Sequence, residues 1–130
     1  MTNSLKTGPI LLIDDDPVVI KLASGILTAA GYEVLTSTDA PKGLEMAMKE
    51  DVSLIVLDVM IPVINGFNIC RLIKTQESRK NIPIILLTSR DEEADRKIGE
   101  EAGANAYIAK PFNSEQFLNT VAALIGQSPG

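Results

Sequence analysis

The chain has 130 residues, 45% of them hydrophobic, and a formal net charge of -5 at pH 7. This length fits one compact domain with a single core and leaves no room for a second. The acidic balance argues against direct binding to nucleic acid or anionic membranes, because both need clustered Lys and Arg. The sequence contains no histidine, so any chemistry must use carboxylates, hydroxyls and lysine.

The predicted domain covers residues 9–126, with flexible tails over 1–8 and 127–130. The first tail lacks the basic start and apolar stretch of a signal peptide, and no apolar run approaches the roughly 18 residues needed to span a bilayer. The single cysteine, Cys70, cannot form an internal disulfide and is predicted to be a buried packing residue. We therefore expect a cytoplasmic protein.

Strand-like and helix-like segments alternate along the chain. Continuous apolar runs at 10–13, 54–57 and 84–87 predict strands that are buried on both faces, as in a parallel sheet. Two weaker strands are predicted at 33–37 and 106–109, and the intervening segments have helical spacing. Five such units with right-handed crossovers predict an α/β fold: a doubly wound, flavodoxin-like (βα)5 domain with a parallel sheet in strand order 2-1-3-4-5.

Capping residues support the predicted helices. Asp16 followed by Pro17 is typical of a helix start, and residues 89–92 and 113–116 have the spacing of a capping box. Two glycines, Gly31 and Gly103, are placed to end the first and the fourth helix.

Reactive polar residues stand where the predicted strands end, and the carboxyl ends of parallel strands are where α/β sheets bind ligands. These residues are Asp14, Asp15 and Asp16 after the first strand, Asp58 after the third, Thr88 after the fourth and Lys110 after the fifth. Converging carboxylates need a proton, a cation or a metal between them, and hard oxygen ligands favour Mg²⁺. A phosphoryl group on Asp58 would meet the metal, the Lys110 ammonium and the Thr88 hydroxyl.

Each of these residues alone also has an ordinary explanation. Asp16 fits a helix cap, and an aspartate such as Asp58 after a strand is a common cap or turn residue. Thr88 would suit any strand end, and Lys110 could be a surface charge. The joint placement of acid, acid, hydroxyl and lysine on successive strand ends is what indicates a site.

The segments 10–17, 57–66, 87–89 and 107–112 resemble, in order and spacing, the response-regulator receiver domain, a chemotaxis-regulator-like family. The resemblance covers essentially the whole chain. It implies a phosphoacceptor switch of a two-component, histidine–aspartate phosphorelay and not an enzyme acting on other substrates, apart from its own phosphorylation and dephosphorylation. Asp58 would be the phosphoacceptor.

The resemblance also implies a metal site. Asp15 would contact Mg²⁺, or Mn²⁺ in its place, directly, and Asp14 largely through water, together with the Asp58 carboxylate and the Met60 backbone carbonyl. Lys110 would bind a phosphoryl oxygen, and the bond from Lys110 to Pro111 is commonly cis in the family. Met60 and Arg90 occupy positions where side chains tune the lifetime of the phosphoryl group.

Thr88 and Tyr107 would form the switch pair. Phosphorylation would draw the Thr88 hydroxyl inward, make room for the Tyr107 ring and remodel the face formed by the fourth helix, the fifth strand and the fifth helix. The implied partners are a sensor histidine kinase or phosphotransfer protein and an unknown downstream protein that binds this face. We expect no direct nucleic-acid contact and no membrane insertion. We expect a stand-alone regulator, and the sequence fits a receiver cut from a larger protein equally well.

Three other functions share parts of this pattern. A phosphatase of the haloacid-dehalogenase type would use Asp14 as its nucleophile, but it needs a further acidic motif after Lys110, where only Glu115 is found. A flavodoxin-like FMN carrier needs hydroxyls and backbone N–H groups in its first loop, where this chain has three carboxylates. A phosphorylation-independent binding module would not require the acceptor, the acidic pair, Thr88 and Lys110 together.

Overall fold

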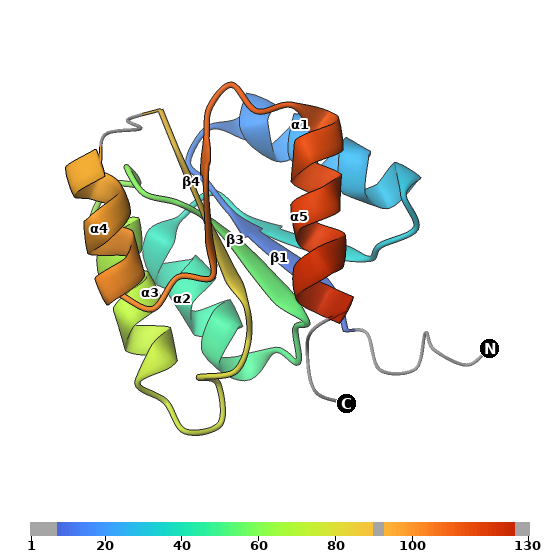
Figure 1. The fold of residues 1–130 in the computed structure, drawn as a ribbon. Helices are drawn as coiled ribbons and strands as arrows, with labels where there is room; N and C mark the ends of the chain where they lie inside the picture. Colours follow the sequence, from blue (N-terminus) through green and yellow to red (C-terminus); the bar gives the residue numbers. More distant parts are fainter. Residues whose placement is uncertain (1–7, 90–92, 127–130) are drawn as a thin grey trace.

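The computed structural model describes residues 8–89 and 93–126. Five strands alternate with five helices along the chain, as the sequence predicts (Figure 1). The strands are β1 (Ile10–Ile13), β2 (Val34–Ser37), β3 (Leu54–Asp58), β4 (Ile84–Thr88) and β5 (Ala106–Ala109). The helices are α1 (Pro17–Ala29), α2 (Ala40–Lys49), α3 (Gly66–Lys74), α4 (Glu93–Glu101) and α5 (Ser114–Gly126).

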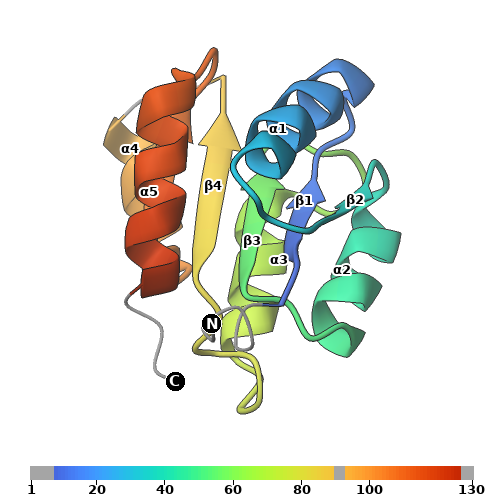
Figure 2. The ribbon, with the colours of Figure 1, turned by 90° about the vertical axis from the view of Figure 1, so that its right-hand side faces the viewer.

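All strands are parallel and form one sheet in the order β2-β1-β3-β4-β5, which confirms the predicted topology. Every residue of β1, β3 and β4 is buried, as expected of central strands covered on both faces. Because the strands run in the same direction, their carboxyl ends lie at one edge of the sheet (Figure 2).

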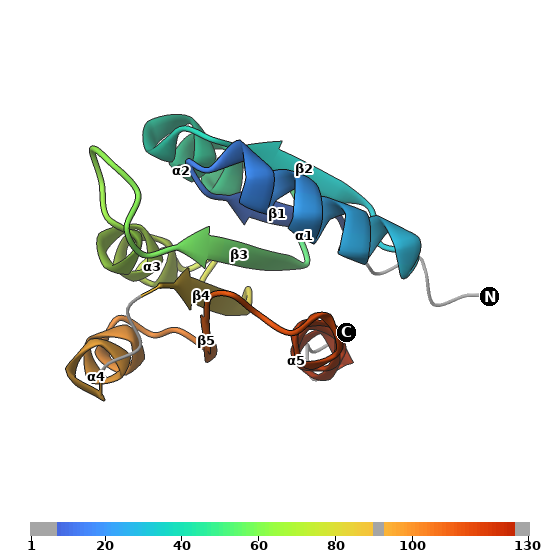
Figure 3. The same cartoon turned by 90° about the horizontal axis from the view of Figure 1, so that it is seen from above.

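Helices cover both faces of the sheet, α1 and α5 on one side and α2, α3 and α4 on the other (Figure 3). Alternate residues of each strand point to opposite faces, so the core is divided in two. Leu12 and Val56 belong to the cluster on the side of α1 and α5, which also contains Leu27 and Phe117 from these helices. Leu11 and Leu57 belong to the cluster on the other face.

The predicted helix signals are confirmed where the structure describes them. Asp16 caps α1 by accepting a hydrogen bond from the Val18 N–H, with Pro17 as the first helical residue. Asn113 accepts a bond from the Gln116 N–H at 2.9 Å and so caps α5. The glycines expected to end α1 and α4 both have positive φ, +100° for Gly31 and +98° for Gly103.

Some predicted strand boundaries differ from the structure, and some predicted features lie outside the described residues. β2 begins at Val34, one residue later than the predicted strand at 33–37. The strands β3 and β4 each extend one residue further than their apolar runs, because Asp58 and Thr88 continue the strand. Arg90 and three of the four residues of the capping box predicted at 89–92 fall in the undescribed segment 90–92, and most of both predicted tails falls in 1–7 and 127–130. Within the ranges 8–89 and 93–126, no helix has the length and apolar character needed to cross a membrane.

Candidate functional site

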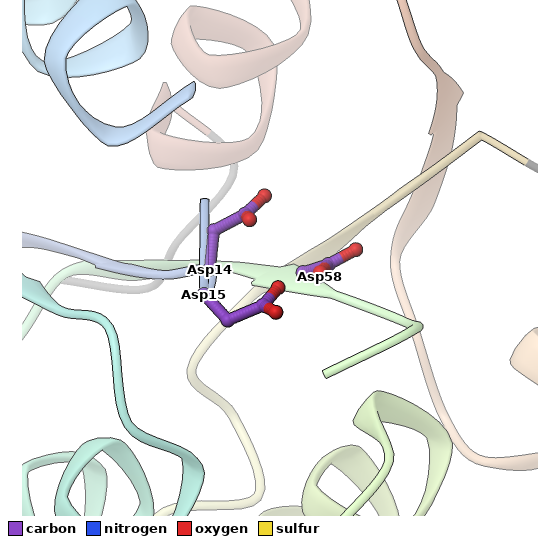
Figure 4. Close-up of side chains that lie close together, drawn as sticks. All are labelled: Asp14, Asp15 and Asp58. Atoms are coloured by element: carbon purple, nitrogen blue, oxygen red, sulfur yellow. The ribbon is translucent and has the colours of Figure 1, made fainter. Parts of the chain in front are cut away.

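Three carboxylates meet at the carboxyl edge of the sheet. Asp14 follows β1 directly, Asp15 comes next, and Asp58 is the last residue of the neighbouring strand β3. One oxygen from each lies within 4.8 Å of the others, and Figure 4 shows the three side chains close together. Asp14 and Asp58 are 2% and 3% exposed, whereas Asp15 is exposed. The acidic pair and the acceptor predicted from the sequence are therefore brought together.

Lys110, directly after the edge strand β5, reaches across to two of these carboxylates. Its Nζ lies 2.9 Å from Asp14 Oδ2 and 3.3 Å from Asp58 Oδ1. Backbone N–H groups hold the same carboxylates: that of Asp16 donates to Asp14 Oδ1 at 2.9 Å, and that of Met60 donates to Asp58 Oδ1 at 3.3 Å. The side chains of Asp14 and Asp58 are therefore oriented by the backbone that follows each of them as well as by Lys110.

Burial and repulsion raise the pKa of Asp58 from an ordinary 3.8 to about 6. The larger cause is burial, which disfavours the charged carboxylate, and the negative charge of Asp14 adds to it. Lys110 and the Met60 N–H act in the opposite direction and only partly compensate. Burial also lowers the pKa of Lys110, but its contacts with Asp14 and Asp58 outweigh burial and leave that pKa raised. Above pH 6, the site therefore holds a buried carboxylate and its ammonium partner, both charged.

The donor set fits a divalent cation. Carboxylate oxygens are the ligands that Mg²⁺ prefers, and this ion commonly takes one or two of them together with waters and phosphate oxygens. Two of the three carboxylates are held by hydrogen bonds, and the third, Asp15, is open to solvent. Asp14, Asp15 and Asp58 can supply these oxygens, since one oxygen from each lies within 4.8 Å of the others.

A glycine allows the β3–α3 loop to return close to Asp58. A Cβ built on Gly66 would overlap the Asp58 carbonyl oxygen and come within 2.8 Å of the Val59 Cα. The Gly66 N–H donates to the Val59 carbonyl at 2.9 Å, and Asn65 caps α3 from the same loop. This contact of Gly66 could not be predicted from the sequence, because a glycine at the start of a helix signals only a change of backbone direction.

The two predicted switch residues lie on adjacent strands. Thr88 is fully buried at the end of β4, and its carbonyl accepts a bond from the Lys110 N–H at 2.7 Å. Tyr107 is half-buried on β5 and pairs in register with Leu86, two residues before Thr88. Since residues two apart on a strand point to the same face, Thr88 and Leu86 face the helix layer that contains α4, where Tyr107 also packs.

Two remaining sequence-based expectations concern Pro111 and Cys70. The Lys110–Pro111 peptide bond is cis, as the resemblance implies. Cys70 is fully buried, and burial raises the pKa of its thiol to about 11. Cys70 lies on α3 away from the carboxylate cluster and serves packing, as predicted.

Comparisons with known proteins agree with this geometry. Residues 10–122 match the family described as the response regulator receiver domain. The chain is 39% identical over 116 residues to the transcriptional regulator RpaA of Synechocystis, covering 89% of this chain and 48% of RpaA. It is 37% identical over 119 residues to the regulatory protein PhoP of Bacillus subtilis, covering 92% of this chain and 49% of PhoP. The chain thus spans about half the length of these relatives.

Solved structures show the same fold. The chemotaxis response regulator CheY4 of Vibrio cholerae superposes with a TM-score of 0.85 at 32% identity, covering 91% of this chain and 98% of that one. The receiver domain of a sensor histidine kinase from Pseudomonas aeruginosa, with a magnesium ion coordinated in its active site cleft, has a TM-score of 0.85 at 31% identity, covering 93% and 99% of the two chains. The match over residues 10–122, together with the carboxylates at the strand ends, shows that this chain belongs to the response regulator receiver domain family.

Proposed function

We propose that Asp58 accepts a phosphoryl group in a Mg²⁺-dependent reaction and that the modified protein signals through its α4-β5-α5 face. The observation that carries the proposal is a buried Asp58 carboxylate at the sheet edge, with two more carboxylates and the Lys110 ammonium around it. The phosphoryl donor is a sensor histidine kinase or a phosphotransfer protein, in keeping with the family.

Asp58 acts as the nucleophile. An oxygen of its carboxylate forms a bond to phosphorus while the bond between phosphorus and the donor breaks, and the donor leaves with that electron pair. The two hydrogen bonds found for this side chain within the described residues both go to Oδ1, which leaves Oδ2 for the attack. With a pKa of about 6, Asp58 is mostly ionised at neutral pH, as a nucleophile must be. Hydrolysis of the acyl phosphate later returns the carboxylate and inorganic phosphate.

Mg²⁺ would be held by Asp14, Asp15, Asp58 and the Met60 backbone carbonyl, with Mn²⁺ as a substitute. When bound, such an ion neutralises negative charge on the phosphoryl oxygens. The Met60 N–H donates to Asp58 Oδ1 at 3.3 Å, so the backbone nitrogen of Met60 lies beside the carboxylate. Lys110, already between Asp14 and Asp58, is placed to turn its ammonium to a phosphoryl oxygen.

Thr88 and Tyr107 would transmit the change. The new phosphoryl oxygens are strong acceptors near the end of β4, and the Thr88 hydroxyl is the donor that would turn toward them. Its movement vacates space on the α4 face, into which the Tyr107 ring would move from its half-buried position. The α4-β5-α5 face would thereby change shape and bind its downstream protein differently.

Intact mass after incubation with acetyl phosphate tests the acceptor. The native chain should gain one phosphoryl group only when Mg²⁺ is present, and hydroxylamine should remove it because the product is an acyl phosphate. Asp58→Asn should gain none, while Asp51→Asn, an exposed aspartate before the opposite end of β3, should behave like the native chain. A gain that persists in Asp58→Asn would refute the assignment and favour Asp14 as the nucleophile.

A further inference from the structure

The side chain of Arg96 covers the ring of Tyr107. The guanidinium carbon lies 5.0 Å from the ring centroid, which is within the range of a cation–π interaction. Arg96 is exposed on α4, whereas Tyr107 is half-buried on the edge strand β5. The contact therefore joins the helix that follows Thr88 to the aromatic residue of the edge strand.

The same helix turn provides the surface on which the ring rests. Gly99 lies three residues after Arg96 and thus on the same side of α4. A Cβ built on Gly99 would lie 3.2 and 3.4 Å from Cδ2 and Cε2 of Tyr107, so the absence of a side chain lets the ring approach the helix. Arg96, Gly99 and Tyr107 also line a hollow of about 240 Å³ between α4 and β5. The ring is held against Gly99 and under Arg96 in this orientation.

We propose that Arg96 is a positioning residue that stabilises the half-buried position of the Tyr107 ring beside Gly99 and so opposes switching until Asp58 is modified. This inference rests on the proposed role of Tyr107 as a switch residue. A movement toward Thr88, as proposed for switching, would take the ring away from the guanidinium, and the contact would then stabilise only one of the two states. A contact made in one state alone shifts the equilibrium by its full free energy.

The expected size of the shift follows from the exposure of Arg96. Exposed cation–π contacts correspond to roughly a two- to fivefold change in an equilibrium constant. Removing the guanidinium should raise the population of the inward state by this factor. A ligand of Asp58 that favours the inward state should then bind more tightly by a similar factor, because binding and switching are linked.

Tyrosine fluorescence can report this equilibrium, because the chain has two tyrosines and no tryptophan. In a Tyr32→Phe background, the emission comes from Tyr107 alone. Acrylamide, a neutral quencher, measures the exposure of the ring during a titration with beryllofluoride and Mg²⁺, which mimic the phosphoryl group on Asp58. The variant is Arg96→Ala, and the matched control is Lys97→Ala, which removes the same charge from the next exposed position of α4.

Relative to the control, Arg96→Ala should reach half-saturation at roughly two- to fivefold less beryllofluoride. At a fixed, sub-saturating concentration, acrylamide should quench its Tyr107 less, because more rings point inward. If Arg96 did no more than cover the ring, its loss would expose Tyr107 and increase quenching by acrylamide. Increased quenching, or a half-saturation equal to that of the control, would overturn the inference.

The same titration separates this inference from the function on which it rests. A Tyr32→Phe parent that does not respond to beryllofluoride, or an Asp58→Asn variant that responds equally, would overturn both proposals. A parent with a normal, Asp58-dependent response and an Arg96→Ala variant identical to Lys97→Ala would overturn only the role of Arg96.

Discussion

Replacing Asp58 by asparagine should stabilise the metal-free protein at neutral pH. The substitution keeps the shape of the side chain and removes a charge that is buried next to Asp14. Burial and this repulsion raise the pKa of Asp58 from 3.8 to about 6, so the native state binds the proton more tightly than the unfolded chain does. The free energy of unfolding of the native sequence therefore falls as the pH rises from about 4 to about 6 and stays lowered above that range.

The size of the effect follows from the same shift. One pH unit of difference in pKa corresponds to about 1.4 kcal/mol, so a rise from 3.8 to about 6 corresponds to about 3 kcal/mol. Asp58→Asn should recover up to this amount above pH 7, which is roughly 10 °C in Tm for a chain of this size. Below pH 4 the native carboxyl is protonated, and the two proteins should be equally stable.

Thermal and urea unfolding in buffers with EDTA, between pH 4 and pH 8, would measure the difference. Asp51→Asn is the control, because it makes the same substitution at an exposed aspartate near the other end of β3. Adding Mg²⁺ should raise the Tm of the native chain more than that of Asp58→Asn, since a ligand stabilises the state that binds it. A stability difference that does not change with pH, or an asparagine variant less stable at pH 7.5, would refute the electrostatic reasoning.

Three further predictions concern the surroundings of Asp58. Lys110→Gln should lower the free energy of unfolding by about 2 kcal/mol at pH 7.5 and by less at pH 4, because it removes the ammonium bound to two buried carboxylates. Urea unfolding at both pH values measures this loss, and an equal loss at both would contradict the prediction. Gly66→Ala should lower the free energy of unfolding by about 1–3 kcal/mol and reduce phosphorylation of Asp58, since the new Cβ would overlap the backbone at the end of β3. The control Gly25→Ala, in the open middle of α1, should not destabilise the fold. Tm measures the stability of each variant, and intact mass measures its phosphorylation. Cys70 should resist iodoacetamide at pH 8 until urea unfolds the chain, because burial keeps its pKa near 11, and rapid labelling of the native protein would be the contrary result.

Local patterns in the sequence were sufficient to predict the fold. Uninterrupted apolar runs such as 54–57 identify strands buried on both faces, and these require helices on both sides of the sheet. The handedness of the crossovers then restricts the sheet to a few doubly wound strand orders, of which 2-1-3-4-5 is a common one. The convergence of Asp14 and Asp58 was also predictable, since neighbouring parallel strands end at the same edge. The boundary error of one residue at Asp58 and Thr88 arises because backbone pairing continues past the last apolar side chain.

Contacts between elements distant in the sequence could not be predicted in this way. Arg96 and Lys97 are adjacent cations on α4, and nothing in the sequence indicates that Arg96 is the one placed over Tyr107. The rotation of α4 about its axis decides this, and that rotation depends on how Gly99 packs against β5. The close approach of Gly66 to the Asp58 carbonyl depends in the same way on the path of a loop.

The charges at the sheet edge connect the stability of the fold with its proposed ligand. Three carboxylates and one ammonium lie together there, so two negative charges remain uncompensated when all groups are ionised. Burial most of all, and then the negative charge of Asp14, raise the pKa of Asp58, and Lys110 offsets them only in part. A divalent cation would remove the remaining repulsion, and a phosphoryl group would bring further negative charge that such a cation and Lys110 could share. The features that make the metal-free site unfavourable for folding are therefore those that would favour binding Mg²⁺ together with a phosphoryl group.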